Sequence, residues 1–341
     1  MDEIKIRKAI ITGSTGGPGQ ALVRKLISEG IEVLLLIRKT SGRAKYLPQS
    51  DLIHIVDCDL QQMKDFTPID TDYDVFFHLG WDYTHPTYRV DPLYQQINIT
   101  NTLDAVKLAK RAGCLKFIGC GSQAEYGRAK DVLTPDTPCR PEIAYGVAKL
   151  CANQMSKLLC IREGIQFNWL RVMSVFGPVD SPGNVVSSTI LGVLSGKELK
   201  YTKGEQIWDL MYTGDLANAF VAVAKKGIDG EVYTVGSGIK RTLREEIETI
   251  VHQLDSKYKI QFGAIPYSEN QIKMLMADNT NISKDTGWRP QFEFEWSIKY
   301  TVSFWKKIYS LYGDNIEEEY FKSGKRICWE NMKGIDEYEN L

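Results

Sequence analysis

The sequence lacks the patterns by which cysteine and histidine hold metals. Its seven cysteines, in 341 residues, are scattered, and none forms a Cys-x-x-Cys pair. The four histidines are also dispersed, and His78 stands in an apolar run that predicts a buried strand. We therefore expect no metal site, and free thiols of the kind kept reduced in the cytoplasm.

An excess of charge of either sign is also missing. The chain carries 42 Lys and Arg against 43 Asp and Glu, for a formal net charge of −1. Proteins that bind nucleic acid or anionic membranes usually carry a basic surplus, so we expect neither partner here. The apolar run 33–37 is far too short for a bilayer span, and residues 1–13 fit neither a signal peptide nor an anchor. The expectation is a cytoplasmic protein with a small-molecule partner.

The chain does contain a regular alternation of apolar runs and amphipathic segments. Runs that are apolar on both faces, each followed by a helical pattern, indicate a parallel sheet covered by helices on both sides. The fold class is therefore predicted as α/β, a Rossmann-type doubly wound parallel sheet with a smaller C-terminal α/β lobe. The predicted strands are 8–12, 31–37, 52–56, 74–79, 115–120 and 165–172, and the predicted helices include 19–29, 91–111 and 142–162.

The rhythm weakens in the Pro/Gly-rich stretch 175–184, which suggests a passage into the smaller lobe. We predict a dinucleotide-binding domain over 1–178, to which a segment at about 205–240 returns. The substrate-binding lobe is assigned to 179–204 and 241–310. The charged stretch 311–341 is predicted to be a peripheral tail.

The first strand is followed by glycines at a G-x-x-G-x-x-G spacing, Gly13, Gly16 and Gly19. Glycines between a strand and a helix allow a tight turn, close approach of a pyrophosphate and close packing of the helix, whose free N–H groups attract the anion. The pattern predicts a dinucleotide cradle that includes Ser14 and Thr15. On spacing alone, a plain glycine-rich connection is the alternative.

The second strand ends in "IRKTSGR", where a dinucleotide fold usually places an acidic residue for the adenosine ribose. Arg38 stands there, followed by other cations and hydroxyls that suit a ribose 2′-phosphate. NADP(H) is therefore favoured as cofactor, and NAD(H) stays possible. A solvated basic loop is the other interpretation.

Tyr145 and Lys149 share one face of a predicted helix, where an ammonium beside a phenol favours the phenolate. Such a tyrosine is a useful acid or base near neutral pH. A surface contact is the alternative, and the other pair at this spacing, Tyr126 and Lys130, lies in a predicted loop. The catalytic interpretation is favoured by Ser122, which follows the fifth strand at the edge where doubly wound sheets bind ligands.

The segments "TGSTGGPG", "DCDL", "HLGW", "GSQAEYG" and "YGVAK" occur in this order along the chain. Together they resemble the extended short-chain dehydrogenase/reductase family, in particular its NAD(P)-dependent nucleotide-sugar epimerases, dehydratases and ketoreductases. The resemblance covers roughly residues 5–300. It implies that Ser122 polarises a sugar carbonyl, that Tyr145 is the acid/base, and that Lys149 tunes Tyr145 and holds the nicotinamide ribose.

The same resemblance implies further contacts. Asp59 and Leu60 match a pair that contacts adenine, Leu79 falls in a cofactor-binding segment, and Asn98 matches a family asparagine. Because members of the family commonly pair through the helices corresponding to 91–111 and 142–162, a homodimer is expected by analogy.

The reaction is narrowed by departures from the family pattern. The dehydratases carry Asp-Glu directly after the catalytic hydroxyl residue, whereas this chain has Gln123 and Ala124, neither of which is a general base. The leading hypothesis is NADPH-dependent reduction of a keto group, at C4, on a nucleotide-activated deoxyhexose. The alternative is an NAD(P)-dependent nucleotide-sugar epimerase, and a non-catalytic NADP-binding sensor is a third possibility.

Substrate contacts are assigned to Ser122, Gln123, Ser174 and Trp208. The family's arginine for the nucleotide diphosphate is missing from the segment around Trp208, which could equally be a core aromatic. Lys203, Lys240 and Arg241 are the basic residues that could replace it, and the alternative is that the substrate is not a standard nucleotide sugar.

Overall fold

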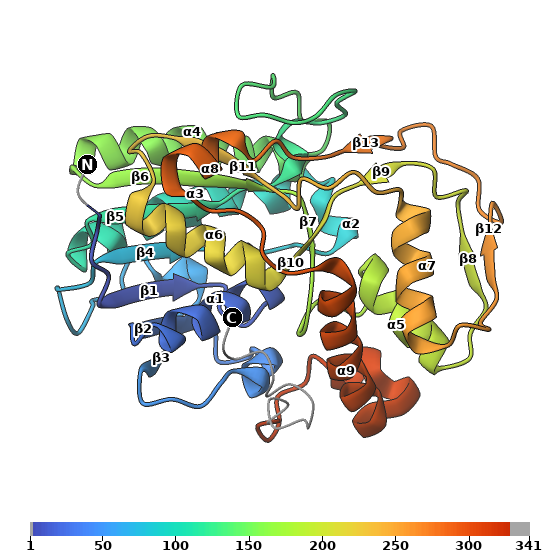
Figure 1. Cartoon of the computed structure of the whole chain (residues 1–341). Helices are drawn as coiled ribbons and strands as arrows, with labels where there is room; N and C mark the ends of the chain where they lie inside the picture. The colour runs from blue at the N-terminus through green and yellow to red at the C-terminus, as the bar shows by residue number, and fades with distance from the viewer. Residues whose placement is uncertain (1–2, 328–341) are drawn as a thin grey trace.

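A seven-stranded parallel sheet forms the centre of the molecule in a computed structural model that describes residues 3–327 (Figure 1). The strand order is β11-β6-β5-β4-β1-β2-β3: successive strands are added on one side of β1 as far as β3 and then, from β4, on its other side. All neighbouring strands are parallel. This arrangement confirms the predicted Rossmann-type doubly wound class. The strands are β1 (Lys8–Thr12), β2 (Glu32–Ile37), β3 (Ile53–Asp57), β4 (Val75–His78), β5 (Lys116–Cys120), β6 (Gln166–Val172) and β11 (Val232–Val235).

Both faces of this sheet are covered by helices. In β1, the consecutive residues Ile10 and Ile11 point to opposite faces because side chains alternate along a strand, and both are fully buried. Ile11 belongs to a core beneath α1 (Gly17–Ser28) and α6 (Thr213–Lys226). Ile10 belongs to a second core beneath α3 (Pro92–Arg111) and α4 (Ala144–Glu163).

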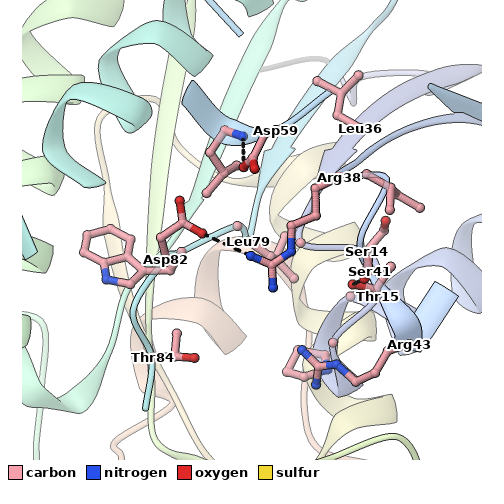
Figure 2. A pocket seen from close by; sticks show the side chains of 18 of the residues that line it. Ser14, Thr15, Leu36, Arg38, Ser41, Arg43, Asp59, Leu79, Asp82 and Thr84 are labelled. Atoms are coloured by element: carbon pink, nitrogen blue, oxygen red, sulfur yellow. Dashed lines mark hydrogen bonds and ion pairs between the residues drawn. The ribbon is translucent and has the colours of Figure 1, made fainter. Parts of the chain in front are cut away.

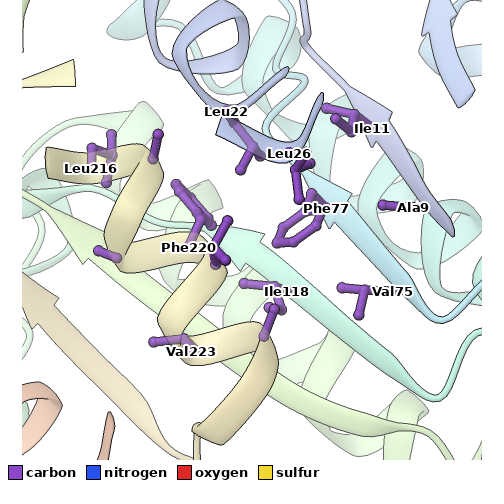
Figure 3. Close-up of a cluster of buried hydrophobic side chains, with 14 of the residues drawn as sticks. Ala9, Ile11, Leu22, Leu26, Val75, Phe77, Ile118, Leu216, Phe220 and Val223 are labelled. Carbon is purple, nitrogen blue, oxygen red and sulfur yellow. The ribbon is translucent and has the colours of Figure 1, made fainter. Parts of the chain in front are cut away.

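The core under α1 and α6 is shown in Figure 3, where side chains of both helices meet those of β1, β4 and β5. Phe77 of β4 packs edge-on against Phe220 of α6, with ring centroids 6.2 Å apart. Leu22 and Leu26, four residues apart on α1, lie on the same buried face. This packing fixes the start of α1 over the carboxyl end of β1, where the glycine-rich turn lies.

The ends of the two helices on the opposite face follow from local sequence. Asp91 accepts a hydrogen bond from the Leu93 backbone at 2.8 Å, and Pro92 occupies the first turn, so α3 begins here. Gly164 ends α4 with a φ of 69°, in the left-handed region that glycine adopts most easily. These boundaries agree with the predicted helices within two residues.

Beyond β6 the chain builds a second region from helices and pairs of short strands. Its two-stranded ladders are β7 with β10, β8 with β12, and β9 with β13, all parallel. The division of the chain into two lobes stays a prediction. The elements are β7 (Ser174–Phe176), α5 (Val185–Leu194), β8 (Leu199–Tyr201), β9 (Ile207–Trp208), β10 (Leu210–Tyr212), α7 (Leu243–Leu254), β12 (Ile260–Phe262), β13 (Met274–Leu275) and α9 (Phe294–Tyr312). Between the last two, α8 (Thr280–Thr286) packs on α6 and β11 of the central sheet.

The segment after α9 differs from the peripheral tail expected from residue 311. It forms η4 (Gly313–Asn315) and α10 (Ile316–Glu319) and packs on η1 (Gly42–Tyr46), just after β2. Tyr320 is fully buried and stacks on Tyr46 at 5.2 Å, while Lys45 Nζ donates to two backbone carbonyls of this segment. The high charge of the stretch concealed the aromatic side chain that anchors it. Residues 328–341, with Cys328, lie outside the described residues.

Candidate active site

The glycine-rich turn between β1 and α1 has the shape of an anion cradle. Gly13 has a φ of +73°, and a Cβ there would lie 2.6 Å from the Gly80 backbone nitrogen. A Cβ at Gly19 would collide with the Gly13 backbone, so α1 can pack this close to the turn only with a glycine at position 19. Gly16 is different, because a Cβ there would meet nothing closer than 3.6 Å. Packing within the protein therefore does not require a glycine at position 16. The open space above it suits a phosphate.

The same turn leaves polar groups available to a ligand. No side chain caps the start of α1, whose N-cap residue is Gly16 and whose first turn contains Pro18. The Ser14 hydroxyl is buried and has no hydrogen-bond partner among the described residues. Backbone N–H groups at a helix start, together with an orphaned hydroxyl, are the donors that a pyrophosphate takes up. The residues present thus fit a bound dinucleotide.

A single cavity gathers most of the residues predicted to bind the cofactor (Figure 2). Its wall runs from the glycine turn, past the end of β2, to the segments after β3 and β4. Tyr145 and Lys149 are not part of this wall, and the binding roles stay predictions. The predicted residues that line it are Gly13, Ser14, Thr15, Gly16, Gly19, Arg38, Asp59, Leu60 and Leu79.

The positive charge of Arg38, on one side of the cavity, is partly neutralised by the carboxylate of Asp82 on the other side. Arg38 Nη1 lies 3.8 Å from Asp82 Oδ1, an ion pair visible in Figure 2. Burial raises the pKa of the Asp82 carboxyl, and the charge of Asp59 raises it further, whereas Arg38 lowers it. Arg43 also lines the cavity, with Nη2 3.9 Å from the Cβ position of Gly16. Arg38 is thus engaged by a carboxylate, which the sequence pattern did not suggest.

Ser122, Tyr145 and Lys149 come together at the carboxyl end of β5. Ser122 begins η3 (Gln123–Glu125) and accepts a hydrogen bond from the Ala124 backbone at 3.2 Å. Tyr145 and Lys149 lie in the first turns of α4 and are 9% and 3% exposed. Lys149 Nζ donates to the Cys120 carbonyl at 2.6 Å.

The electrostatics of this cluster suit proton transfer. Burial raises the pKa of the Tyr145 phenol, and this rise is opposed by the Arg89 cation and by a hydrogen bond with the Ser122 side chain. Burial lowers the pKa of Lys149 to about 8. A tyrosine whose protonation depends on nearby cations and hydroxyls is the kind of group that acts as general acid and base.

Trp81 lies between the cavity beside the glycine turn and the cluster of Ser122, Tyr145 and Lys149. It lines the cavity, lies edge-on to the Tyr145 ring at 5.9 Å, and has Lys149 Nζ 3.7 Å from its ring centroid. Its indole N–H donates to Gln95 Oε1 at 3.0 Å. Asn98, expected from the resemblance, exchanges two hydrogen bonds with the backbone of Asp82 and so fixes the same loop. No role was predicted for Trp81 from the sequence; its place directly after Leu79 and Gly80, in a segment that carries the family resemblance, is the signal that could have found it.

The predicted substrate residues lie in three different elements of the structure. Gln123 lies in η3 beside Ser122, whereas Ser174 lies in the β7–β10 ladder. Trp208 in β9 is partly buried and packs against two hydrophobic clusters, so its contacts here are those of a core aromatic. A small second cavity contains Arg241, whose guanidinium lies 4.7 Å from the Phe294 ring centroid. The substrate roles of all these residues remain predictions.

A doubly wound sheet with a dinucleotide cradle and a Ser-Tyr-Lys cluster defines an enzyme of the extended short-chain dehydrogenase/reductase type. Comparison with known proteins agrees, because residues 9–236 match the model of the NAD dependent epimerase/dehydratase family. The chain belongs to this family. No helix within residues 3–327 is long and apolar enough to cross a membrane.

Individual relatives are distant but similar over most of their length. UDP-glucose 4-epimerase from Mycolicibacterium smegmatis is 25% identical over 88% of this chain and 98% of its own. UDP-glucuronic acid decarboxylase 1 from Danio rerio is 25% identical over 90% of this chain and 74% of its own. Among solved structures, the UDP-N-acetylglucosamine 4-epimerase from Methanobrevibacter ruminantium M1, in complex with UDP-N-acetylmuramic acid, gives a TM-score of 0.81 at 25% identity, covering 89% of this chain and 99% of that one.

Proposed function

We propose that this enzyme is an NAD-dependent epimerase that acts at C4 of a UDP-sugar. The observation that carries the proposal is the cluster of Ser122, Tyr145 and Lys149, with no carboxylate at positions 123 and 124. Such a site can exchange one hydride and one proton in either direction but has no second base for elimination. The similarity to two 4-epimerases over nearly their whole lengths favours epimerisation among the reactions that remain.

The residues of the chain have distinct parts in this reaction. The Ser122 hydroxyl binds the sugar oxygen at the reacting carbon, and the Tyr145 phenolate takes the hydroxyl proton during oxidation and returns it during reduction. Lys149, held by the Cys120 carbonyl, supplies positive charge beside the cofactor. A dinucleotide in such a site supplies reversible hydride transfer. Gly13, Gly16 and Gly19 would hold its pyrophosphate, and Asp59 and Leu60 its adenine.

The nucleotide diphosphate of the substrate needs a cationic partner. We assign this part to Arg241, which lines the second cavity between β10 and α9. Hydrogen bonds lower the pKa of the neighbouring Glu245 carboxyl and burial raises that of Glu246, and the positive charge of Arg241 acts to lower both. Lys203 and Lys240 stay as further candidates. Loss of UDP binding in Arg241→Met, with unchanged binding of the dinucleotide, is the expected result.

The comparisons favour the epimerase over the ketoreductase that the sequence suggested as the leading hypothesis, since they provide no support for ketoreductase activity. The reductase keeps one specific observation in its favour. Arg38 and Arg43 line the cofactor cavity together with Ser41, a set that suits a 2′-phosphate. We therefore retain NADPH-dependent reduction of a keto sugar as the second candidate.

One assay separates the two candidates. The purified enzyme is incubated with UDP-glucose, UDP-galactose and their N-acetylated forms, and the epimers are quantified together with the oxidation state of the dinucleotide. Interconversion without net consumption of NADH or NADPH supports the epimerase. Stoichiometric oxidation of NADPH by a 4-keto sugar, without interconversion, supports the reductase. Tyr145→Phe is the matched control, and activity that survives in it contradicts both.

The outer faces of α3 and α4 fit a second copy of the chain. Leu93, Leu158 and Ile161 are 75%, 68% and 67% exposed, although all three are large apolar residues. Because α3 and α4 pack side by side, these residues belong to one helical layer on the outside of the sheet. We propose that the enzyme is a homodimer through these two helices.

A further inference from the structure

Arg89 places a positive charge directly against the ring of Tyr145. It is the last residue of α2 (Pro86–Arg89), and its guanidinium carbon lies 4.5 Å from the Tyr145 ring centroid. Its Nε is buried and has no hydrogen-bond partner among the described residues. Its contact with the Tyr145 ring is thus a cation–π interaction, in which the guanidinium lies against the ring.

The other charged and titratable groups around Tyr145 are farther away or already engaged. Lys149 Nζ lies 5.9 Å from the ring centroid and points to the Cys120 carbonyl and the Trp81 indole. Burial raises the pKa of the Cys120 thiol, which keeps that group neutral near pH 7.

Glu125 is the carboxylate behind Ser122. Its Oε1 accepts hydrogen bonds from Ser122 N and Trp169 Nε1, both at 2.9 Å. Its Oε2 accepts from Arg171 Nε at 2.9 Å. These donors occupy both oxygens, and the Glu125 charge raises the pKa of the Tyr145 phenol less than the Arg89 charge lowers it. Arg89 is also the cation nearer to the Tyr145 ring centroid.

Arg89 is held in place from outside the catalytic cluster. Gln95, on α3, donates from Nε2 to the Tyr83 carbonyl at 2.9 Å and to the Tyr88 carbonyl at 3.1 Å. The rings of Tyr83 and Tyr88 also pack on Tyr94 of α3, at 4.7 and 4.8 Å. These contacts attach the segment that carries Arg89 to α3, while Arg89 itself lies against Tyr145 of α4.

We propose that Arg89 is a positioning residue that holds the Tyr145 ring and supplies the main positive charge favouring its phenolate form. Lys149 then serves chiefly the cofactor side of the site. This inference rests on the proposed function in one respect, the assignment of Tyr145 as the acid/base. An opposite charge at about 4–6 Å lowers the pKa of an acid by about one to three units, and Arg89 lies in this range of the ring.

The test measures the titration of Tyr145 itself. Ultraviolet absorbance of tyrosinate is followed with pH in the apo enzyme, and the curve of the Tyr145→Phe version of each background is subtracted, which isolates this tyrosine. Arg89→Met is expected to raise its pKa by about one unit or more, and Arg89→Lys to restore most of the lowering. Arg128→Met, which removes an exposed arginine paired with Glu142, is the control and leaves the titration unchanged.

Turnover provides the second measurement. The limb of kcat/KM that rises with pH is expected to move upward with the Tyr145 pKa in Arg89→Met. An unchanged Tyr145 titration in Arg89→Met overturns the inference even if the enzyme epimerises UDP-sugars. A shifted titration in an enzyme that turns over no nucleotide sugar overturns the proposed function and leaves the role of Arg89 standing. The inference about Arg89 is also overturned if Tyr145 of the wild type stays protonated until the protein unfolds. If Arg89→Met does not fold, Arg89→Gln takes its place.

Discussion

The buried ion pair between Glu125 and Arg171 allows a prediction whose size follows from the structure. The two side chains are 0% and 5% exposed and lie 2.9 Å apart. Among the described residues, removing Arg171 leaves Glu125 Oε2 with one hydrogen-bond donor, Asn153 Nδ2 at 3.4 Å, at a fully buried place. Breaking a buried pair by deleting one partner costs about 3–5 kcal/mol, because the remaining charge stays uncompensated.

We therefore expect Arg171→Leu to lower the free energy of unfolding by about 3–5 kcal/mol, measured by urea denaturation at neutral pH. Removing both charges together, as Glu125→Gln with Arg171→Leu, is expected to cost less than Arg171→Leu alone. Arg128→Leu is the matched control, since its pair with Glu142 is 44% and 43% exposed and such pairs contribute about 1 kcal/mol or less. A loss in Arg171→Leu no larger than that of the control would refute the assignment of a desolvated pair.

Three further results are expected. Gly16→Ala weakens dinucleotide binding, measured by calorimetry, with little loss of stability, whereas Gly19→Ala lowers the melting temperature because its Cβ meets the Gly13 backbone; equal effects of the two would contradict the cradle. Leu158→Glu converts the dimer to a monomer in analytical ultracentrifugation, and a wild-type monomer would disprove the interface. The third result compares the free energy of unfolding of Lys149→Met with that of the wild type at two pH values. Burial lowers the pKa of Lys149 from 10.5 to about 8, so keeping this lysine charged below that range destabilises the folded wild type but not the variant. The difference in favour of Lys149→Met is therefore expected to grow by about 3 kcal/mol between about pH 10.5 and pH 7. A difference between these two proteins that does not change with pH would show that Lys149 is not desolvated.

The parts of the fold that depend on local sequence could be predicted. The first strand is predicted and found at Lys8–Thr12, because its buried Ile10 and Ile11 mark two covered faces. The glycine turn could be predicted from its spacing between a strand and a helix. Gly19 is required by a contact with the Gly13 backbone within the same turn, which is a local signal. Gly13 is required by its positive φ and also by the backbone of Leu79 and Gly80 after β4, a tertiary contact that the spacing does not show.

The environment of Tyr145 could not be predicted in the same way. Its spacing to Lys149 suggested that the ammonium would act on the phenol, which stays a prediction; Lys149 Nζ lies 5.9 Å from the ring centroid and donates to the Cys120 carbonyl. Arg89 is 56 residues away in sequence, and its guanidinium lies 4.5 Å from the ring centroid. Nothing in the segment "HPTYRVDP" shows that its arginine faces a tyrosine of another helix.

The cluster of Ser122, Tyr145 and Lys149 serves reduction and epimerisation equally, so the difference must come from how the cofactor is held. A reductase has to release its oxidised dinucleotide after each turnover, whereas an epimerase returns the hydride to the same sugar and gains from retention. The pair formed by Arg38 and Asp82 spans the cofactor cavity, and the segment carrying Tyr320 braces η1 beside it. Both contacts tie segments that line or adjoin this wall. If the enzyme is the proposed epimerase, we expect the arginine that suggests a 2′-phosphate to help retain the dinucleotide through its pair with Asp82, and a dinucleotide that stays bound through purification and is lost in Arg38→Ala would support this.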